Sequence, residues 1–218
     1  MGKRFDLIVF DWDGTILDST GAIGRSIKAA CRDLCLPEPA DEMARQVIGL
    51  GLADALRIAV PDLPEDSVSE IIARYRYHYL SCDQDLCLFE GVPSLMGELQ
   101  AGGYSLAVAT GKSRRGLERA FEHSGLGSFF HASRCADECF SKPHPQMLME
   151  LMEELEVEPD RTVMIGDTVH DLQMARNAGV SALAVSYGAH PKESLLSIEP
   201  DACFADVAEM LGWLRLNA

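Results

Sequence analysis

The sequence predicts an α/β fold in which a parallel sheet has helices on both faces and a helical segment is inserted near the N-terminus. Three observations lead to this prediction. From residue 89 onward, short apolar runs alternate with segments of helical periodicity, a pattern typical of parallel sheets. Residues 17–88 contain successive helical segments and no convincing strand. The apolar run 7–10 is too short for a helix and ends directly in two carboxylates.

The first predicted strand, residues 7–10, delivers Asp11 and Asp13 at its carboxyl end. Open α/β sheets bind their ligands at this end of the strands. Side chains alternate along an extended strand, so the two carboxylates start on one face, and the Gly-Thr turn that follows can fan them around a ligand. An arbitrary Asp-x-Asp is more often a pair of solvated loop residues. Here a second acidic pair, Asp167 and Asp171, follows a later strand, which favours a functional site.

The stretch between residues 17 and 88 is predicted to be a separate helical domain. A first helix, capped by Ser19 or Thr20, carries apolar residues at helical spacing, and prolines end the segments that follow. The expected helices run from about residue 20 to 34, around 43–48, from 52 to 59 and from about 66 to 80. We therefore expect residues 1–16 and 89–218 to form an α/β catalytic core domain, and residues 17–88 to form a helical cap domain.

The rest of the chain alternates between strands and helices. Helices are predicted over 93–102, 113–124, up to about 156, 171–178 and 206–216, and strands over 104–109, 131–134, 161–165 and 180–185. This order predicts a Rossmann-like core, a parallel sheet covered on both faces.

Composition limits the possible partners of the protein. The net charge of −15 over 218 residues argues against a nucleic-acid surface, which needs clustered lysine and arginine. No apolar run approaches the ~20 residues of a membrane span, and the residues before the first strand do not form the apolar region of a signal peptide. We expect a cytoplasmic protein that binds neither nucleic acid nor membrane.

Cysteine usage points to the same compartment. Seven cysteines, an odd number, occur without a Cys-x-x-Cys pair. Cys31 and Cys35, and likewise Cys135 and Cys139, are one helical turn apart, so a metal or redox role is conceivable. Free cysteine in a cytosolic protein more often behaves as a small buried apolar residue. We expect a reduced, mostly buried set of core residues.

Four loops together place polar residues where a ligand would bind. On these motifs the chain resembles the haloacid dehalogenase-like (HAD) hydrolase superfamily, in the branch with a helical cap inserted after the first strand (capped subfamily I). The matching segments are Asp11-Trp12-Asp13-Gly14-Thr15, Thr110 within Val-Ala-Thr-Gly, Lys142 within Ser-Lys-Pro-His-Pro, and Gly166-Asp167-x-x-x-Asp171. The motifs keep the order and usual spacing of the family. With the Gly-x-Gly turn at 49–51, the layout is most similar to phosphoglycolate phosphatase-type enzymes.

The resemblance implies a role for each acid, and their chemistry supports it. An ionised Asp11 can attack phosphorus without a base and give an acyl phosphate that water cleaves. A neighbouring negative charge favours the protonated form of Asp13, which can then act as general acid and afterwards as general base. Asp11, Asp167 and the backbone carbonyl of Asp13 form an all-oxygen set suited to Mg²⁺. Asp171 is expected in the outer shell of the metal.

Two further motifs are expected to bind the phosphoryl group. Lys142 would bring a positive charge to Asp11 and the phosphoryl oxygens, while Thr110 and Gly111 would donate hydrogen bonds from a hydroxyl and from backbone amides. By themselves, a lysine and a threonine are more often a solvated loop residue and a helix cap. His144 and His170 are not required by the family pattern.

The resemblance implies a Mg²⁺-dependent phosphatase acting on a small phosphorylated metabolite such as phosphoglycolate. A sugar phosphomutase of the same superfamily shares the acids and the cap, and stays open as an alternative. A catalytically idle binding module is a weaker one. The substrate is not written in the motifs. Four arginines of the insert are candidates to bind a carboxylate or second phosphate, namely Arg45, Arg57, Arg74 and Arg76. The motifs do not specify an oligomeric state.

Overall fold

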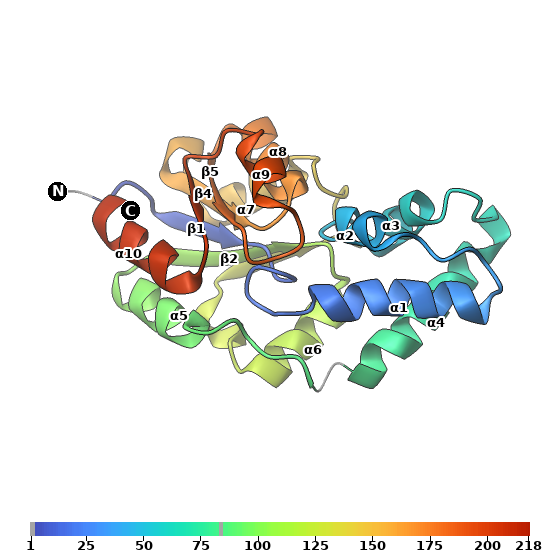
Figure 1. The fold of residues 1–218 in the computed structure, drawn as a ribbon. Coiled ribbons are helices and arrows are strands. Elements are labelled where there is room, and N and C mark those ends of the chain that lie inside the picture. Colours follow the sequence, from blue (N-terminus) through green and yellow to red (C-terminus); the bar gives the residue numbers. More distant parts are fainter. Residues whose placement is uncertain (1–2, 83–84) are drawn as a thin grey trace.

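A computed structural model, which describes residues 3–82 and 85–218, has the predicted α/β architecture (Figure 1). Six parallel strands form one sheet in the order β3-β2-β1-β4-β5-β6. The strands are β1 (Leu7–Phe10), β2 (Ser105–Thr110), β3 (Ala132–Cys135), β4 (Thr162–Gly166), β5 (Ser181–Val185) and β6 (Ala202–Phe204). The first strand in the chain lies in the middle of the sheet, so it can be buried from both sides.

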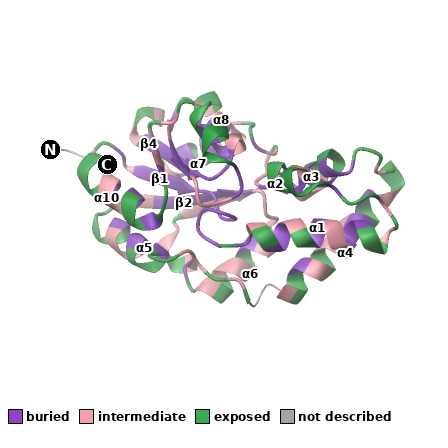
Figure 2. Cartoon of the chain, viewed as in Figure 1, coloured by how far each residue is buried: buried purple, intermediate pink, exposed green. Residues whose placement is uncertain are grey.

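Helices cover both faces of the sheet. The core helices are α5 (Val92–Ala101), α6 (Arg114–Ser124), α7 (Gln146–Leu155), α8 (Val169–Ala178), α9 (Lys192–Leu196) and α10 (Val207–Asn217), with short 3₁₀ turns η3 (Gly127–Phe129) and η4 (Pro159–Arg161). Alternation along β1 sends Ile8 and Phe10 into one apolar cluster with α5, α6 and α10, and Leu7 and Val9 into another with α7 and α8. Figure 2 shows the strands buried and the outer faces of the helices exposed.

Four helices form an insert between β1 and β2, called the helical insert below. They are α1 (Thr20–Asp33), α2 (Asp41–Gln46), α3 (Leu52–Ala59) and α4 (Val68–Cys82), with a 3₁₀ turn η1 (Glu65–Ser67) before the last. The helices pack around a further apolar cluster, which includes Ile27, Leu56 and Ile71 and takes in Ala189 from outside the insert. The chain leaves and rejoins the sheet at an antiparallel bridge between Leu17 and Leu88.

The predicted elements differ from the observed ones by one or two residues at their ends. The prediction omitted β6 and α9, which have three and five residues. Elements this short hold little more than one period of a helical or strand pattern, so periodicity could not reveal them.

The cysteines only partly follow the prediction. All seven are free, and Cys31 and Cys135 are buried. The expectation of a buried core set is wrong for Cys35 and Cys87, which are exposed. Cys35 lies just after α1, and Cys87 lies in the segment between α4 and α5, so both are in connections between elements. Within the described ranges, none of the helices has the length and apolar character needed to cross a membrane.

Candidate active site

The carboxyl ends of three neighbouring strands bring the predicted motifs together. Because β1 pairs with both β2 and β4, the residues that follow these strands meet at one edge of the sheet. Asp11 follows β1, Thr110 ends β2 and Asp167 follows β4. The backbone amide of Asp11 still donates to the carbonyl of Ile165 at 2.9 Å, which fixes the first acid against its neighbouring strand.

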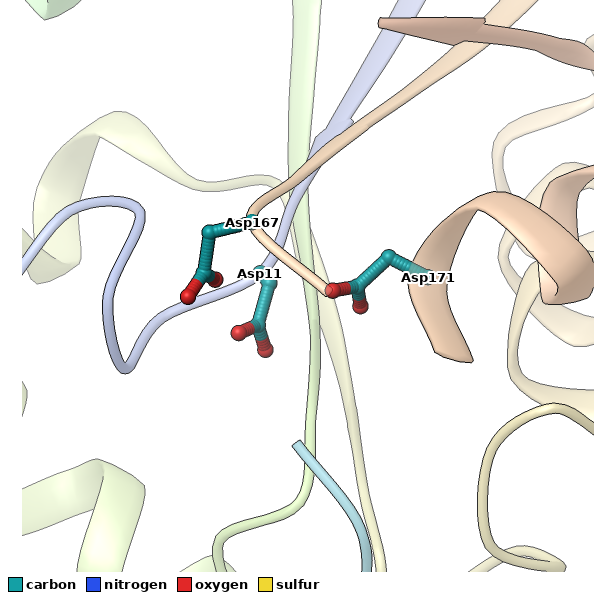
Figure 3. A group of neighbouring side chains, drawn as sticks. All are labelled: Asp11, Asp167 and Asp171. Carbon is teal, nitrogen blue, oxygen red and sulfur yellow. The ribbon is translucent and has the colours of Figure 1, made fainter. Parts of the chain in front are cut away.

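Three buried carboxylates form the centre of the site. Oxygens of Asp11, Asp167 and Asp171 all lie within 4.8 Å of one another, and none of the three residues is more than 1% exposed. Figure 3 shows Asp11 between the other two acids. Asp167 accepts hydrogen bonds from the Thr15 hydroxyl at 2.9 Å and the Ala189 amide at 2.7 Å.

Asp171 is held by the start of α8. The amide and hydroxyl of Thr168 donate to Asp171 Oδ2 at 3.1 and 2.6 Å, and together the two residues form a capping box. The other oxygen, Oδ1, accepts from Lys142. Both oxygens of Asp171 are thus already hydrogen-bonded, although its carboxylate lies within the three-acid group.

Lys142 connects two of the three acids. Its Nζ lies 2.6 Å from Asp11 Oδ1 and 2.6 Å from Asp171 Oδ1, and its side chain is fully buried. Burial by itself would lower the pKa of this ammonium, but Asp11 and Asp171 raise the pKa above its ordinary value. Lys142 is therefore a buried, charged residue at the predicted site and not a solvated loop lysine.

One ammonium does not balance three carboxylates, and the site fits a further cation. Burial raises the pKa of Asp11 well above its ordinary value, against the effect of Lys142, and burial and then Asp171 raise the pKa of Asp167 to about 7. Among the described residues, Asp11 Oδ2 has no hydrogen-bond partner although it is buried. A free carboxylate oxygen beside other carboxylates is the donor chemistry that Mg²⁺ prefers.

Three glycines leave space for these acids. A Cβ atom on Gly14 or Gly188 would collide with the carboxylate of Asp167, and one on Gly166 would collide with Asp171. Gly14 also has a φ of +88°, which L side chains rarely adopt. The turn after Asp13 thus needs glycine for two independent reasons.

Asp13 lies beside the three-acid group and has different neighbours. Its Oδ1 accepts from the Ser19 hydroxyl at 2.6 Å and lies 3.0 Å from Lys112 Nζ. Ser19 is the N-cap residue of α1, but its side chain makes no capping hydrogen bond, so the predicted capping role of this hydroxyl is wrong. The hydroxyl is directed to Asp13 instead.

Lys112 is a site residue that the sequence reasoning missed. Besides Asp13, its Nζ contacts the Tyr79 hydroxyl at 3.1 Å, so it joins the sheet edge to α4 of the insert. Burial would lower the pKa of this lysine, but Asp13 and then Tyr79 raise the pKa above its ordinary value. Its place two residues after Thr110, in a motif already identified, was the available signal.

The second motif lies directly beneath the insert. Thr110 is buried and its Oγ1 accepts from the Lys112 amide at 3.1 Å. A Cβ atom on Gly111 would collide with the carbonyl oxygens of Gly49 and Leu50. The Gly-x-Gly turn of the insert and the glycine of the second motif therefore approach each other closely.

A cavity of about 540 Å³ lies between the insert and the sheet edge. Asp11, Asp13 and Lys112 line it on the sheet side, whereas Thr110 and Lys142 do not. Of the four insert arginines proposed from the sequence, Arg76 lines the cavity and Arg45, Arg57 and Arg74 do not.

Some of the cationic side chains that line the cavity come from α6 of the core and not from the insert. Arg57 pairs with Glu65 at 2.6 Å, away from the lining. Arg115 and Arg119 of α6 line the cavity, although the sequence reasoning did not single them out. Their spacing of four residues on one helix puts them on the same face.

Comparison with known proteins identifies the family. The model of the haloacid dehalogenase-like hydrolases matches residues 8–185, which includes all four motifs. The chain belongs to this family. This hydrolase is 34% identical over 212 residues to "Probable phosphatase IndB" of Dickeya dadantii, covering 94% of this chain and 92% of the relative.

Further similarities have the same character. A phosphoglycolate phosphatase of Haemophilus influenzae is 29% identical to this hydrolase, with 97% of the chain and 99% of the relative covered. The crystal structure of a predicted phosphoglycolate phosphatase from Haemophilus somnus superimposes with a TM-score of 0.87 at 27% identity, covering 97% and 99% of the two chains. The chain is thus an enzyme of the hydrolase family and matches these relatives over nearly their whole length.

Two histidines of this hydrolase lie at the contact between insert and core, outside the three-acid group. His170 Nε2 and His190 Nε2 lie 2.8 and 3.2 Å from the carbonyl oxygen of Gln46, at the end of α2. His144 is exposed and its ring contacts Phe140.

The raised pKa of Asp167 predicts how the metal-free hydrolase responds to pH. The unfolded carboxyl loses its proton near pH 4, whereas the folded one holds it until about pH 7, so the folded state binds more protons in between. The free energy of unfolding in the presence of a chelator should therefore fall by up to ~4 kcal/mol between pH 4 and 7 through this group. Urea unfolding across this range measures it. Asp167→Asn should remove that part of the fall, and an identical pH profile in both proteins would contradict the assignment.

Proposed function

We propose that this hydrolase is a Mg²⁺-dependent phosphatase that cleaves a small phosphomonoester through an aspartyl phosphate on Asp11. The observation that carries the proposal is the environment of Asp11. It lines the cavity, contacts a buried lysine through Oδ1, and has a second oxygen without a hydrogen-bond partner among the described residues. The relatives named as phosphatases support the same reaction class.

Asp11, Asp167 and the backbone carbonyl of Asp13 are the proposed metal ligands, with Asp171 behind them. Asp171 accepts hydrogen bonds from the Lys142 ammonium and from Thr168, which suits a role in orienting other groups. By contrast, Asp167 accepts only from uncharged donors, the Thr15 hydroxyl and the Ala189 amide, among the described residues. When bound, Mg²⁺ supplies positive charge that offsets the repulsion between phosphoryl oxygens and carboxylates.

The first half-reaction joins Asp11 to phosphorus. A carboxylate oxygen of Asp11 attacks, the bond from phosphorus to the substrate oxygen breaks, and Asp13 gives a proton to that oxygen. Lys142 keeps a positive charge beside Asp11 during the attack, and the Thr110 hydroxyl and the Gly111 amide are the proposed donors to phosphoryl oxygens.

The second half-reaction returns the enzyme to its starting state. Water attacks phosphorus in the aspartyl phosphate, Asp13 takes the proton from that water, and Asp11 leaves as a carboxylate. Asp13 is suited to both proton transfers because it lines the cavity beside Asp11. Ser19 and Lys112 hold its carboxylate in one orientation.

We further propose that residues 1–16 and 89–218 form the catalytic core and residues 17–88 the cap. The separate apolar cluster of the insert supports this division. Polar links join the insert to the core, such as the Gly51 amide donating to Ser141 Oγ at 2.8 Å, and Ala189 of the core packs into the apolar cluster of the insert. A cap of this kind could move to admit substrate and then exclude water.

Phosphate release in heavy-oxygen water tests the proposal against a mutase. With Mg²⁺ and a panel that includes phosphoglycolate and hexose phosphates, we expect multiple turnovers and inorganic phosphate that carries one solvent oxygen. The label is expected because water attacks phosphorus in the second half-reaction. Isomerisation of a sugar phosphate without phosphate release would establish a mutase instead. An absence of turnover on every compound, with a folded protein, would favour the binding module.

A further inference from the structure

The cavity wall supplied by the insert is chemically unlike the floor. Sixteen of the described lining residues belong to the insert, and only Asp54 and Arg76 among them are charged. The uncharged side is dominated by aliphatic and aromatic side chains, among them Ile23, Ile27, Val47, Ile48, Ile72 and Tyr75. A wall of this composition binds apolar surface and offers few partners for polar groups.

Most of the charged lining residues come from the core. Asp11 and Asp13 form the floor, where the phosphoryl group must be placed for the proposed reaction. Arg76 and Arg115 are exposed as well as lining, so they lie where the cavity meets solvent. Lys112, Arg119 and Asp137 of the core also line the cavity, so the apolar part of the wall is the part that the insert supplies.

An aromatic pair adds a flat surface to this wall. Tyr75 and Tyr79 both belong to α4, and their rings stack on each other with centroids 5.8 Å apart and an interplanar angle of 17°. Tyr79 also contacts Lys112, which lies 3.0 Å from Asp13. The aromatic surface is therefore linked through Lys112 to Asp13, the residue that protonates the leaving group in the proposed reaction.

We propose that the leaving group of the substrate is a bulky apolar alcohol, such as one that carries an aromatic ring. The inference rests on the proposed phosphatase function, which places phosphorus at Asp11 and the leaving oxygen near Asp13. The rest of the molecule then extends from the floor toward the apolar wall. A volume of about 540 Å³ falls within the ~300–1,000 Å³ typical of pockets for drug-sized ligands. A two-carbon acid would leave most of this wall uncovered.

A series of phosphate esters of primary alcohols tests the size preference of the wild-type protein. Ethyl, butyl, hexyl and 2-phenylethyl phosphate have similar leaving-group chemistry and differ in apolar surface, and phosphoglycolate serves as the small anionic comparison. A buried methylene is worth roughly a threefold to fourfold change in binding. We expect kcat/KM to be at least about 30-fold higher for the hexyl and phenylethyl esters than for the ethyl ester.

Two neighbouring substitutions on α4 show whether the wall causes that preference. Ile72→Asp places a charge in the lining, whereas Ala73→Asp places the same charge on an exposed residue outside it. Ile72→Asp should reduce the ratio of kcat/KM for phenylethyl over ethyl phosphate at least about tenfold, and Ala73→Asp should leave the ratio unchanged. The ratio is measurable from the active fraction of a partly unstable variant.

The outcomes separate this inference from the function on which it rests. If ethyl phosphate or phosphoglycolate is turned over as fast as the bulky esters or faster, the proposal of an apolar leaving group is wrong. The proposed phosphatase function would still stand. Equal loss of the ratio in both aspartate variants would also overturn it. Failure to hydrolyse any ester of the series or phosphoglycolate with Mg²⁺ present would count against the phosphatase itself.

Discussion

Asp11→Asn is expected to lower phosphatase turnover by at least about 10³-fold, because an amide cannot supply the attacking oxygen. No phosphoenzyme should be trapped when this variant is mixed with substrate and quenched in acid. The change removes one of three crowded carboxylates and keeps a side chain of the same shape. A folded but inactive protein is therefore expected, and thermal unfolding verifies it.

Asp13→Asn is the matched comparison, because it alters the proton-transfer residue and leaves Asp11 in place. It should slow both half-reactions. A substrate with a very acidic leaving group needs little protonation, so it should partly rescue the first step and let phosphoenzyme accumulate. A phosphoenzyme that survives Asp11→Asn would refute the assignment of the nucleophile.

Removal of divalent metal is expected to abolish turnover, and Mg²⁺ should restore it. Metal is needed because the three carboxylates outnumber the positive charges beside them: among the described residues, Lys142 is the one ammonium in contact with Asp11, Asp167 or Asp171. Asp167→Ala deletes a proposed ligand and should raise the Mg²⁺ concentration needed for half-maximal activity by at least about tenfold, or abolish activity. Titration of activity with Mg²⁺ after chelation measures this.

Asp160→Ala serves as the control for that experiment, since Asp160 is exposed and lies seven residues earlier in the chain. Its Mg²⁺ dependence should match that of the wild type. Mg²⁺ should also raise the midpoint of thermal unfolding of the wild type more than that of Asp167→Ala. Undiminished turnover after thorough chelation would exclude the metal site.

The fold and the positions of the catalytic-site acids could be predicted because both depend on patterns of neighbouring residues in the sequence. Asp11 and Asp167 follow short apolar strands, and the position of such residues depends only on the edge of the sheet at which parallel strands end. Lys112 was missed because its contacts with Asp13 and Tyr79 depend on where the insert packs. The sequence could not show which of the four candidate arginines lines the cavity for the same reason, since helical spacing does not tell which face of a helix meets the core.

The position of β1 has a consequence for how the polypeptide folds as it is synthesised. This strand contains residues 7–10, yet its two neighbours in the sheet are residues 105–110 and 162–166. The ribosome completes the helical insert, whose contacts are local, before either partner of β1 exists. Long-range pairing of this kind is slow and leaves strand edges exposed meanwhile. Chains that end before residue 162 hold a central strand with one open edge, and such fragments are expected to aggregate rather than fold.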